Sequence, residues 1–143
     1  MTDAVTDFIA QRLPIVMIDR ITYADNDKAI TTLDITSDTL FTEKGIFREP
    51  GLIENIAQTA AAQVGYMCKQ QNIPVPIGYI AAIRNLSILK LPVVGNRITT
   101  TITRKNQILD IMLIDGVIQL DDEIIGSCEM RVFIKSNTHE DHI

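Results

Sequence analysis

Histidine, a residue type common in acid–base catalysis and in metal binding, is scarce in this chain of 143 residues. The chain has only two histidines, His139 and His142, and both belong to the segment HEDH near the C-terminal end. No predicted strand or helix there would fix a metal geometry. The chain also lacks a glycine-rich phosphate loop and a cluster of cysteine and histidine. We therefore expect neither a metal nor a redox cofactor.

Cysteines and long apolar runs are also few. The two cysteines, Cys68 and Cys128, do not make a disulfide framework in a chain of this size. No stretch approaches the roughly 20 apolar residues that are needed to cross a bilayer. The N-terminal sequence MTDAVTDFIAQRLP carries acids and lacks the apolar run of a signal peptide. We expect free thiols, a cytoplasmic location and no membrane partner.

Basic residues are outnumbered by acids. The chain has 13 Lys and Arg against 18 Asp and Glu, for a net charge of −5. Because a nucleic-acid-binding protein needs a basic face, we expect no nucleic-acid partner. A hydrophobic fraction of 46% is ordinary for a globular protein, and the length fits one domain. We expect that domain over residues 1–135 and a disordered polar tail over 136–143.

The chain is rich in small apolar residues over one long stretch, FREPGLIENIAQTAAAQVGY, residues 47–66. Pro50 and Gly51 stand where helix starts tolerate them. Apolar residues recur after them at helical spacing and predict a helix over about 50–71. Its small side chains would let neighbouring elements approach closely. Glu54 is the one acid early in this apolar helix, and it is the first candidate for chemistry.

β-rich segments flank this helix. Before it, a short helix is predicted over 3–12, a strand hairpin over 15–24 and 28–36, and a loop over 37–50. The strands predicted after the helix form an antiparallel meander over 79–90, 97–105, 107–120 and 123–135. Strands segregated around one helix indicate an α+β protein. We predict a single hot-dog fold, an antiparallel sheet wrapped around a long central helix.

Four segments in order carry a resemblance that covers about residues 10–134. QRLPIVMIDRI is similar to HRYPFLLVDRV, with Arg12, Pro14, Asp19 and Arg20 in register. ENIAQTAAA resembles EALAQAAG, and AAIRNLSILKLPVVGNRI resembles AGIDKARFKRPVVPGDQL. IGSCEMRVFI resembles the last strand of the same proteins. These are the hot-dog 3-hydroxyacyl-[acyl carrier protein] dehydratases of fatty-acid and related polyketide or pigment pathways.

The chain departs from this family just before the long helix. The dehydratases carry GHFPGRPIMPG there, and its histidine is the general base. This chain has the shorter EKGIFREPG, without a histidine. The resemblance therefore implies that the chain keeps the acid of the catalytic pair, Glu54, and lacks the base.

The resemblance assigns roles to four residues of the helix. Glu54 would act as the general acid when a 3-hydroxyacyl thioester is dehydrated. Gln58, one turn further on the same face, would orient Glu54 or bind the hydroxyl. Backbone N–H groups around Gly51 and Leu52 would polarise the thioester carbonyl.

Family sites are built across a dimer interface, with histidine from one chain and the acid from the other. A homodimer of this chain would hold two acids and no imidazole, whereas a heterodimer with a histidine-bearing homologue would complete one site. The substrate would be an acyl thioester on acyl carrier protein or coenzyme A. Two alternatives stay open: a hot-dog acyl-thioesterase that uses Glu54, and a non-catalytic acyl-binding or scaffold subunit.

Overall fold

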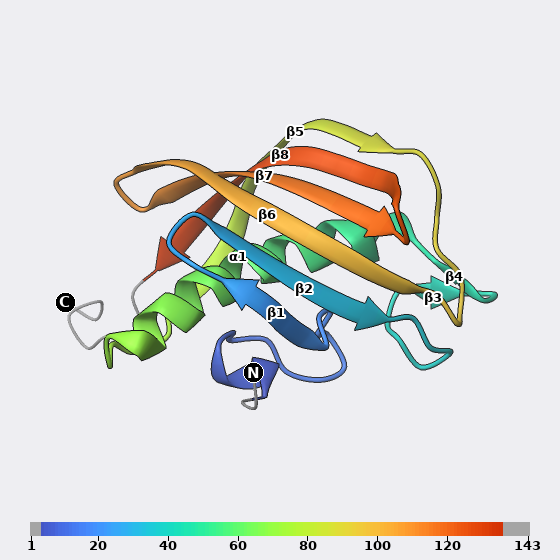
Figure 1. Ribbon diagram of the computed structural model, residues 1–143, viewed down its shortest axis with the longest axis horizontal. Helices are drawn as coiled ribbons and strands as arrows, with labels where there is room; N and C mark the ends of the chain where they lie inside the picture. The colour runs from blue at the N-terminus through green and yellow to red at the C-terminus, as the bar shows by residue number, and fades with distance from the viewer. Residues whose placement is uncertain (1–3, 136–143) are drawn as a thin grey trace.

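One sheet folded around one long helix makes up the protein, as a computed structural model of residues 4–135 shows (Figure 1). The helix α1 spans Glu49–Gln70, within a residue or so of its predicted bounds. The other elements in chain order are η1 Val5–Asp7, β1 Arg20–Ala24, β2 Lys28–Asp34, β3 Thr42–Glu43, β4 Ile46–Phe47, β5 Ile77–Ile88, β6 Arg97–Ile108, β7 Ile111–Leu120 and β8 Glu123–Lys135. The tail expected over 136–143, with both histidines, lies outside the described residues.

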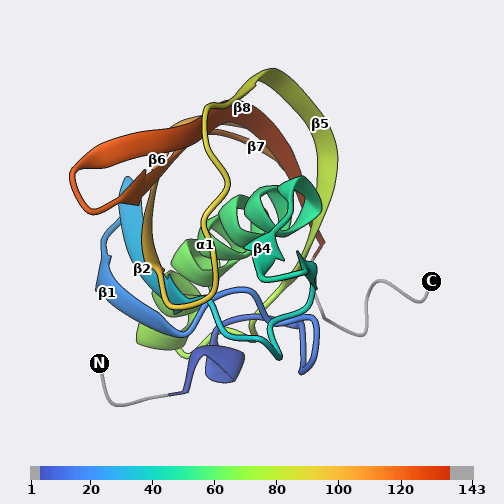
Figure 2. The ribbon, with the colours of Figure 1, turned by 90° about the vertical axis from the view of Figure 1, so that its right-hand side faces the viewer.

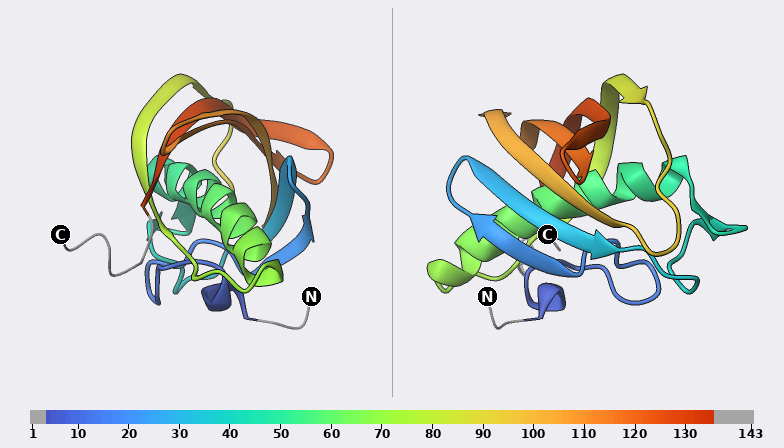
Figure 3. Two further views of the ribbon diagram at one scale, coloured as in Figure 1. Left: turned by 90° about the vertical axis from the view of Figure 1, so that its left-hand side faces the viewer. Right: turned by 45° about the vertical axis from the view of Figure 1, so that its right-hand side comes forward.

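The six main strands form one antiparallel sheet in the order β1-β2-β6-β7-β8-β5. The sheet curves over α1, and the N-terminal segment crosses the opposite side of the helix (Figures 2 and 3). The predicted hot-dog fold is therefore confirmed. Within residues 4–135, no helix combines the length and the apolar character needed to span a membrane.

Small residues let the elements close around α1. A Cβ added at Gly116 of β7 would lie 2.5 Å from Cγ2 of Ile56, so this strand rests directly on the helix. A Cβ at Gly65 would lie 1.8 Å from the carbonyl oxygen of Phe8, so the N-terminal segment touches the helix backbone. These contacts show the close packing that the small residues of this helix predicted.

The strand order corrects the predicted meander. β6, β7 and β8 do form one, but β5 pairs with β8 rather than with β6. Residues 89–96 carry the chain from β5 across to the far side of β7 and β8. β5 is therefore an edge strand, and its outer side has no neighbouring strand in the described part of the chain. Sequence order alone did not reveal this because strand pairing is a long-range property.

Two predictions for the N-terminal region were wrong. Where a helix was expected over 3–12, the structure has only a 3-10 turn. The apolar residues Phe8 and Ile9 pack against Ala61 and Ala62 of α1 and do not continue a helix. The strand expected from residue 15 begins at Arg20. Before it, Asp19 bonds to Thr32 of β2, but Ile15 and Met17 bond to side chains of α1 instead of a neighbouring strand.

Gln58 makes most of those bonds. Its Oε1 accepts from the N–H of Met17 at 2.6 Å, and its Nε2 donates to the carbonyl of Ile15 at 2.8 Å. Asn55 adds a third bond, from Nδ2 to the carbonyl of Met17 at 2.7 Å. The segment that covers the open side of α1 is thus held by two polar side chains of the helix. This pairing also satisfies backbone groups that burial would otherwise leave without partners.

Two turns differ from the sequence prediction. The loop expected over 37–50 contains a small hairpin of β3 and β4, turned at Lys44 and Gly45, which both have positive φ. The strand expected over 107–120 is interrupted, because Leu109 and Asp110 form the turn between β6 and β7. Leu109 has a φ of 54°, and leucine gives no sequence signal for that conformation.

Gln58→Ala is expected to lower the free energy of unfolding by about 2–4 kcal/mol, because backbone groups of Ile15 and Met17 lose their partners. Urea denaturation followed by circular dichroism measures the change. Gln70→Ala is the matched control, since Gln70 is exposed on the same helix. Equal stability losses in the two variants would contradict the role given to Gln58.

Candidate active site

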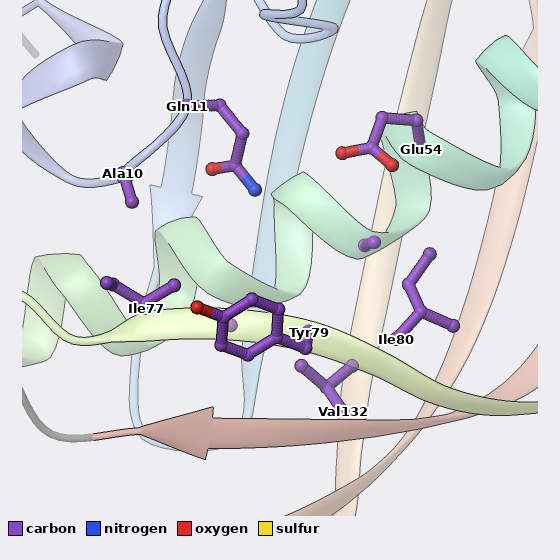
Figure 4. A pocket seen from close by; sticks show the side chains of 9 residues that line it. Ala10, Gln11, Glu54, Ile77, Tyr79, Ile80 and Val132 are labelled. Carbon is purple, nitrogen blue, oxygen red and sulfur yellow. The ribbon is translucent and has the colours of Figure 1, made fainter.

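Glu54 lies in a half-open pocket between α1, β5 and the N-terminal segment (Figure 4). The pocket has a volume of about 360 Å³. It is not the largest hollow of the surface, and we single it out because it contains the predicted acid. The residues that line it are Ala10, Gln11, Glu54, Ala57, Ile77, Gly78, Tyr79, Ile80 and Val132. Apart from Glu54, Gln11 and Tyr79, the lining is apolar.

Gln58 fixes the position of Glu54. Its Nε2 donates to Oε1 of Glu54 at 3.0 Å, in addition to the bond with the Ile15 carbonyl. Gln58 is fully buried, whereas Glu54 is half-buried and reaches the pocket. Both amide hydrogens and the carbonyl oxygen of Gln58 are therefore engaged. Of the two roles expected for Gln58, this geometry favours orienting Glu54 over binding the substrate hydroxyl.

Gly51 and Leu52 do not line this pocket. The N–H groups of both residues point to the carbonyl of Arg48, at 3.0 Å and 3.4 Å, as expected in a first helical turn. Gly51 instead provides room for Phe47, since an added Cβ would lie 2.4 Å from the ring. The role of these two N–H groups in polarising a thioester carbonyl stays a prediction, and their observed partners do not favour it.

Sequence reasoning did not place the other two polar residues of the pocket beside Glu54. Gln11 comes from the N-terminal segment, and Tyr79 comes from the edge strand β5. A signal for Gln11 was present, because QRLPIVMIDRI puts it where the similar motif HRYPFLLVDRV has a histidine. Tyr79 gave none, since its place beside Glu54 depends on the pairing of β5 with β8.

The pocket lining offers no imidazole or amine to act as the missing base. There is no histidine in residues 4–135, and the pocket lining includes no lysine or arginine. Both cysteines are free, and burial raises the pKa of each thiol, that of Cys128 to about 11. Thiols with raised pKa values are poor nucleophiles and bases near neutrality. No group of three or more possible metal ligands occurs among the described residues.

The site thus presents one fixed carboxyl group in a mostly apolar, half-open pocket beside a free sheet edge. A carboxyl group in this setting can deliver a proton to, or take one from, an acyl chain lying along β5. A reaction that needs this acid and an imidazole base would take the imidazole from outside residues 4–135.

Solved structures with the same fold include a dehydratase heterocomplex, an uncharacterized protein and a hypothetical thioesterase. A chain of the dehydratase heterocomplex ApeI:P from Xenorhabdus doucetiae superposes with a TM-score of 0.85 at 12% identity, over 99% of this chain and 97% of that one. The uncharacterized protein PH1136 from Pyrococcus horikoshii gives a TM-score of 0.69 at 11% identity, with 97% and 98% covered. At such identities these matches show the fold alone.

A hypothetical thioesterase from Streptococcus pneumoniae TIGR4, solved with coenzyme A, superposes with a TM-score of 0.64 at 13% identity. The superposition covers 82% of this chain and 85% of the thioesterase chain. No curated protein matches the chain.

One protein family matches almost the whole sequence. The ApeP-like family, described as ApeP dehydratase, matches residues 3–142, which include every residue of the Glu54 pocket. This match agrees with the resemblance carried by the four sequence segments and with the hot-dog fold. The chain therefore belongs to the ApeP-like dehydratase family.

Proposed function

We propose that this chain contributes the acid Glu54 to a 3-hydroxyacyl-thioester dehydratase site that it shares with a histidine-bearing homologue. The observation that carries the proposal is the half-site itself: a fixed carboxyl group, a half-open pocket and no imidazole in residues 4–135. Membership of the ApeP-like family supports dehydration as the reaction and aryl polyene pigment biosynthesis as its setting. The free thiols fit the cytoplasmic location that we propose for it.

The edge strand β5 is the proposed place of assembly. An edge strand presents unpaired backbone groups that another strand can bond. β5 also exposes apolar side chains, with Tyr79 51% and Ile80 38% exposed, and both line the Glu54 pocket. A partner that pairs with this edge would cover the pocket and bring its own residues next to Glu54. One structurally similar protein is itself part of a dehydratase heterocomplex, which supports a mixed assembly.

The proposed chemistry divides the proton transfers between two chains. A histidine of the partner removes a proton from C2 of the substrate, and the electron pair of that C–H bond forms the C2–C3 double bond. The C3–O bond breaks, and Glu54 delivers a proton to the departing hydroxyl, which leaves as water. Gln58 holds the carboxyl group for this transfer through the bond at 3.0 Å. The acyl group would be carried by acyl carrier protein or coenzyme A.

Glu54→Gln is expected to lower dehydration by the mixed complex by about 10²–10⁴-fold, the usual contribution of a general acid. Turnover of a 3-hydroxyacyl thioester would be followed for this chain alone, the homologue alone and the mixture. Glu49→Gln is the control, because Glu49 is an acid of the same helix that pairs with Arg48 at the surface. Undiminished turnover in the Glu54→Gln mixture would refute the proposed role.

The same assay separates the alternatives. Hydrolysis of the thioester by this chain alone, together with its loss in Glu54→Gln, would favour a thioesterase function. A hypothetical thioesterase is among the proteins with a similar fold. Dehydration by this chain alone would show that a homodimer suffices and that another group replaces the histidine. If the chain changes neither its own nor the homologue's turnover, an acyl-binding or scaffold role is the best remaining function.

Ile80→Lys is expected to weaken assembly at least about ten-fold, because a charged side chain on the edge strand opposes strand pairing. Sedimentation of the two purified chains at several concentrations measures this. Ile108→Lys is the matched control, since Ile108 is 58% exposed on β6 and two strands separate it from β5. If Ile108→Lys disrupted assembly and Ile80→Lys did not, the interface would lie elsewhere.

A further inference from the structure

We propose that Gly78 of β5 makes room for the acyl chain of the substrate, so that the site selects 3-hydroxyacyl thioesters with an extended chain. The part of the chain beyond C3 lies along β5 and over Gly78, while Glu54 acts at C3. This inference rests on the proposed function, because the position of C3 is taken from the position of Glu54. It makes Gly78 the residue that sets the accepted chain length.

Gly78 has none of the structural reasons that explain the other glycines of the chain. Of the seven glycines, two have positive φ, and at three others an added Cβ would lie 2.5 Å or less from a neighbouring atom. A sixth, Gly126, adjoins a register shift between β7 and β8. Gly78 does not have a positive φ, and its pairing with Ile134 lies in a regular stretch of the ladder between β5 and β8.

A Cβ would also fit at Gly78. It would lie 3.4 Å from Cγ1 of Val132, 3.5 Å from Cδ1 of Ile134 and 3.6 Å from Cβ of Ala61. These are close to ordinary van der Waals distances, so neither strand pairing nor contact with α1 requires a glycine here. Glycine within a strand is unfavourable, and it often marks a place where a ligand comes close to the backbone. A ligand is the explanation that remains.

The position without a side chain belongs to the pocket of Glu54. Gly78 and Ile80 lie on the same face of β5, because side chains alternate along a strand, and both line the pocket. Val132, whose Cγ1 is the nearest neighbour of the added Cβ, lines it too. Since side chains already close the inner side of that Cβ, any atoms beyond it would extend into the pocket.

The pocket follows the course of β5. Figure 4 shows Glu54 and Ile80 toward one end of the pocket, and Ala10 and Ile77 toward the other. Gly78 lies between the two isoleucines in the strand. Because a strand rises about 3.3 Å per residue, these isoleucines are about 10 Å apart along β5. Apolar side chains at both ends suit an acyl chain, and the missing side chain between them leaves its path open.

Binding of two stable analogues tests this inference without depending on turnover. The probes are pantetheine amides that carry a 3-hydroxydecanoyl or a 3-hydroxybutanoyl group, and binding is measured to the mixed complex and to this chain alone. Gly78→Ala is expected to weaken the decanoyl probe about ten-fold, the effect of one carbon atom in an apolar pocket, and the butanoyl probe less than about two-fold. Gly78→Val should weaken the decanoyl probe further, because its outer methyl groups extend into the pocket.

Gly126→Ala is the matched control. Gly126 is also a strand glycine where a Cβ has room, with the nearest atom at 3.6 Å, and it does not line the pocket. This variant should leave the ratio of the two affinities unchanged. Equal weakening of both probes by Gly78→Ala, or an unchanged ratio with a loss of assembly, would assign the glycine to packing and overturn the inference. An equal shift of the ratio in Gly126→Ala would overturn it as well.

Turnover of the two corresponding thioesters separates this inference from the proposed function. Glu54→Gln should lower dehydration of both by the same factor and leave the affinity ratio unchanged, because it alters the acid and not the path of the chain. Loss of turnover in Glu54→Gln, together with an affinity ratio indifferent to Gly78, would overturn the inference and leave the proposed function intact. A ratio that depends on Gly78, in a complex that dehydrates neither thioester, would support the role of Gly78 and refute the proposed function.

Discussion

The carboxamide of Gln58 connects the covering segment of this protein with its candidate chemistry. One side chain bonds to Ile15, Met17 and Glu54, so both of its N–H donors and its acceptor oxygen are engaged. Two of these bonds close the N-terminal segment over the side of α1 that the sheet leaves open. The third sets the position of the only acid in the pocket. A change at Gln58 would therefore disturb the covering segment and the acid together.

Buried polar groups along α1 give the helix a fixed register inside the sheet. Thr59 bonds to Thr31 of β2, Asn55 to Thr100 of β6, and Gln63 to the carbonyl of Asp25. Apolar packing of small side chains alone would allow the helix to slide or rotate, whereas these directional bonds specify one arrangement. In that arrangement Glu54 lies beside the edge strand β5 rather than beneath the centre of the sheet.

The open pocket and the free edge of β5 are two aspects of one arrangement. Because β8 takes the inner side of β5, the outer side and its apolar residues remain available to another chain. Such an edge is usually protected, and pairing with a partner would protect it. A protein that holds an acid at this edge, and no imidazole in residues 4–135, is suited to a site completed by assembly.

Local patterns were sufficient for much of the fold. The small apolar residues between Gly51 and Gly65 predicted α1, and alternating segments predicted β6 and β8. Patterns failed where structure depends on distant partners. Residues 15–17 have a strand-like composition but bond to Gln58, about 40 positions away. The edge position of β5 depends on β8, and two strands, β6 and β7, separate them in the sequence.

For the site, the resemblance identified Glu54 and Gln58, which the structure places in contact. It pointed to Gly51 and Leu52 for substrate binding, but they lie outside the pocket lining. Gln11 was missed because only the folded path of the N-terminal segment brings it to Glu54. Its match to the histidine of HRYPFLLVDRV was a signal, but a separation of more than 40 positions in the sequence hides its place beside Glu54.

The most direct measurement is a crystal structure of the mixed complex with a 3-hydroxyacyl pantetheine amide bound. Our account predicts that the partner pairs with the outer side of β5. It also predicts that the carboxyl of Glu54 and an imidazole of the partner both lie within hydrogen-bonding reach of the same ligand. A complex in which Glu54 faces solvent, or in which the ligand occupies a site without it, would contradict the account.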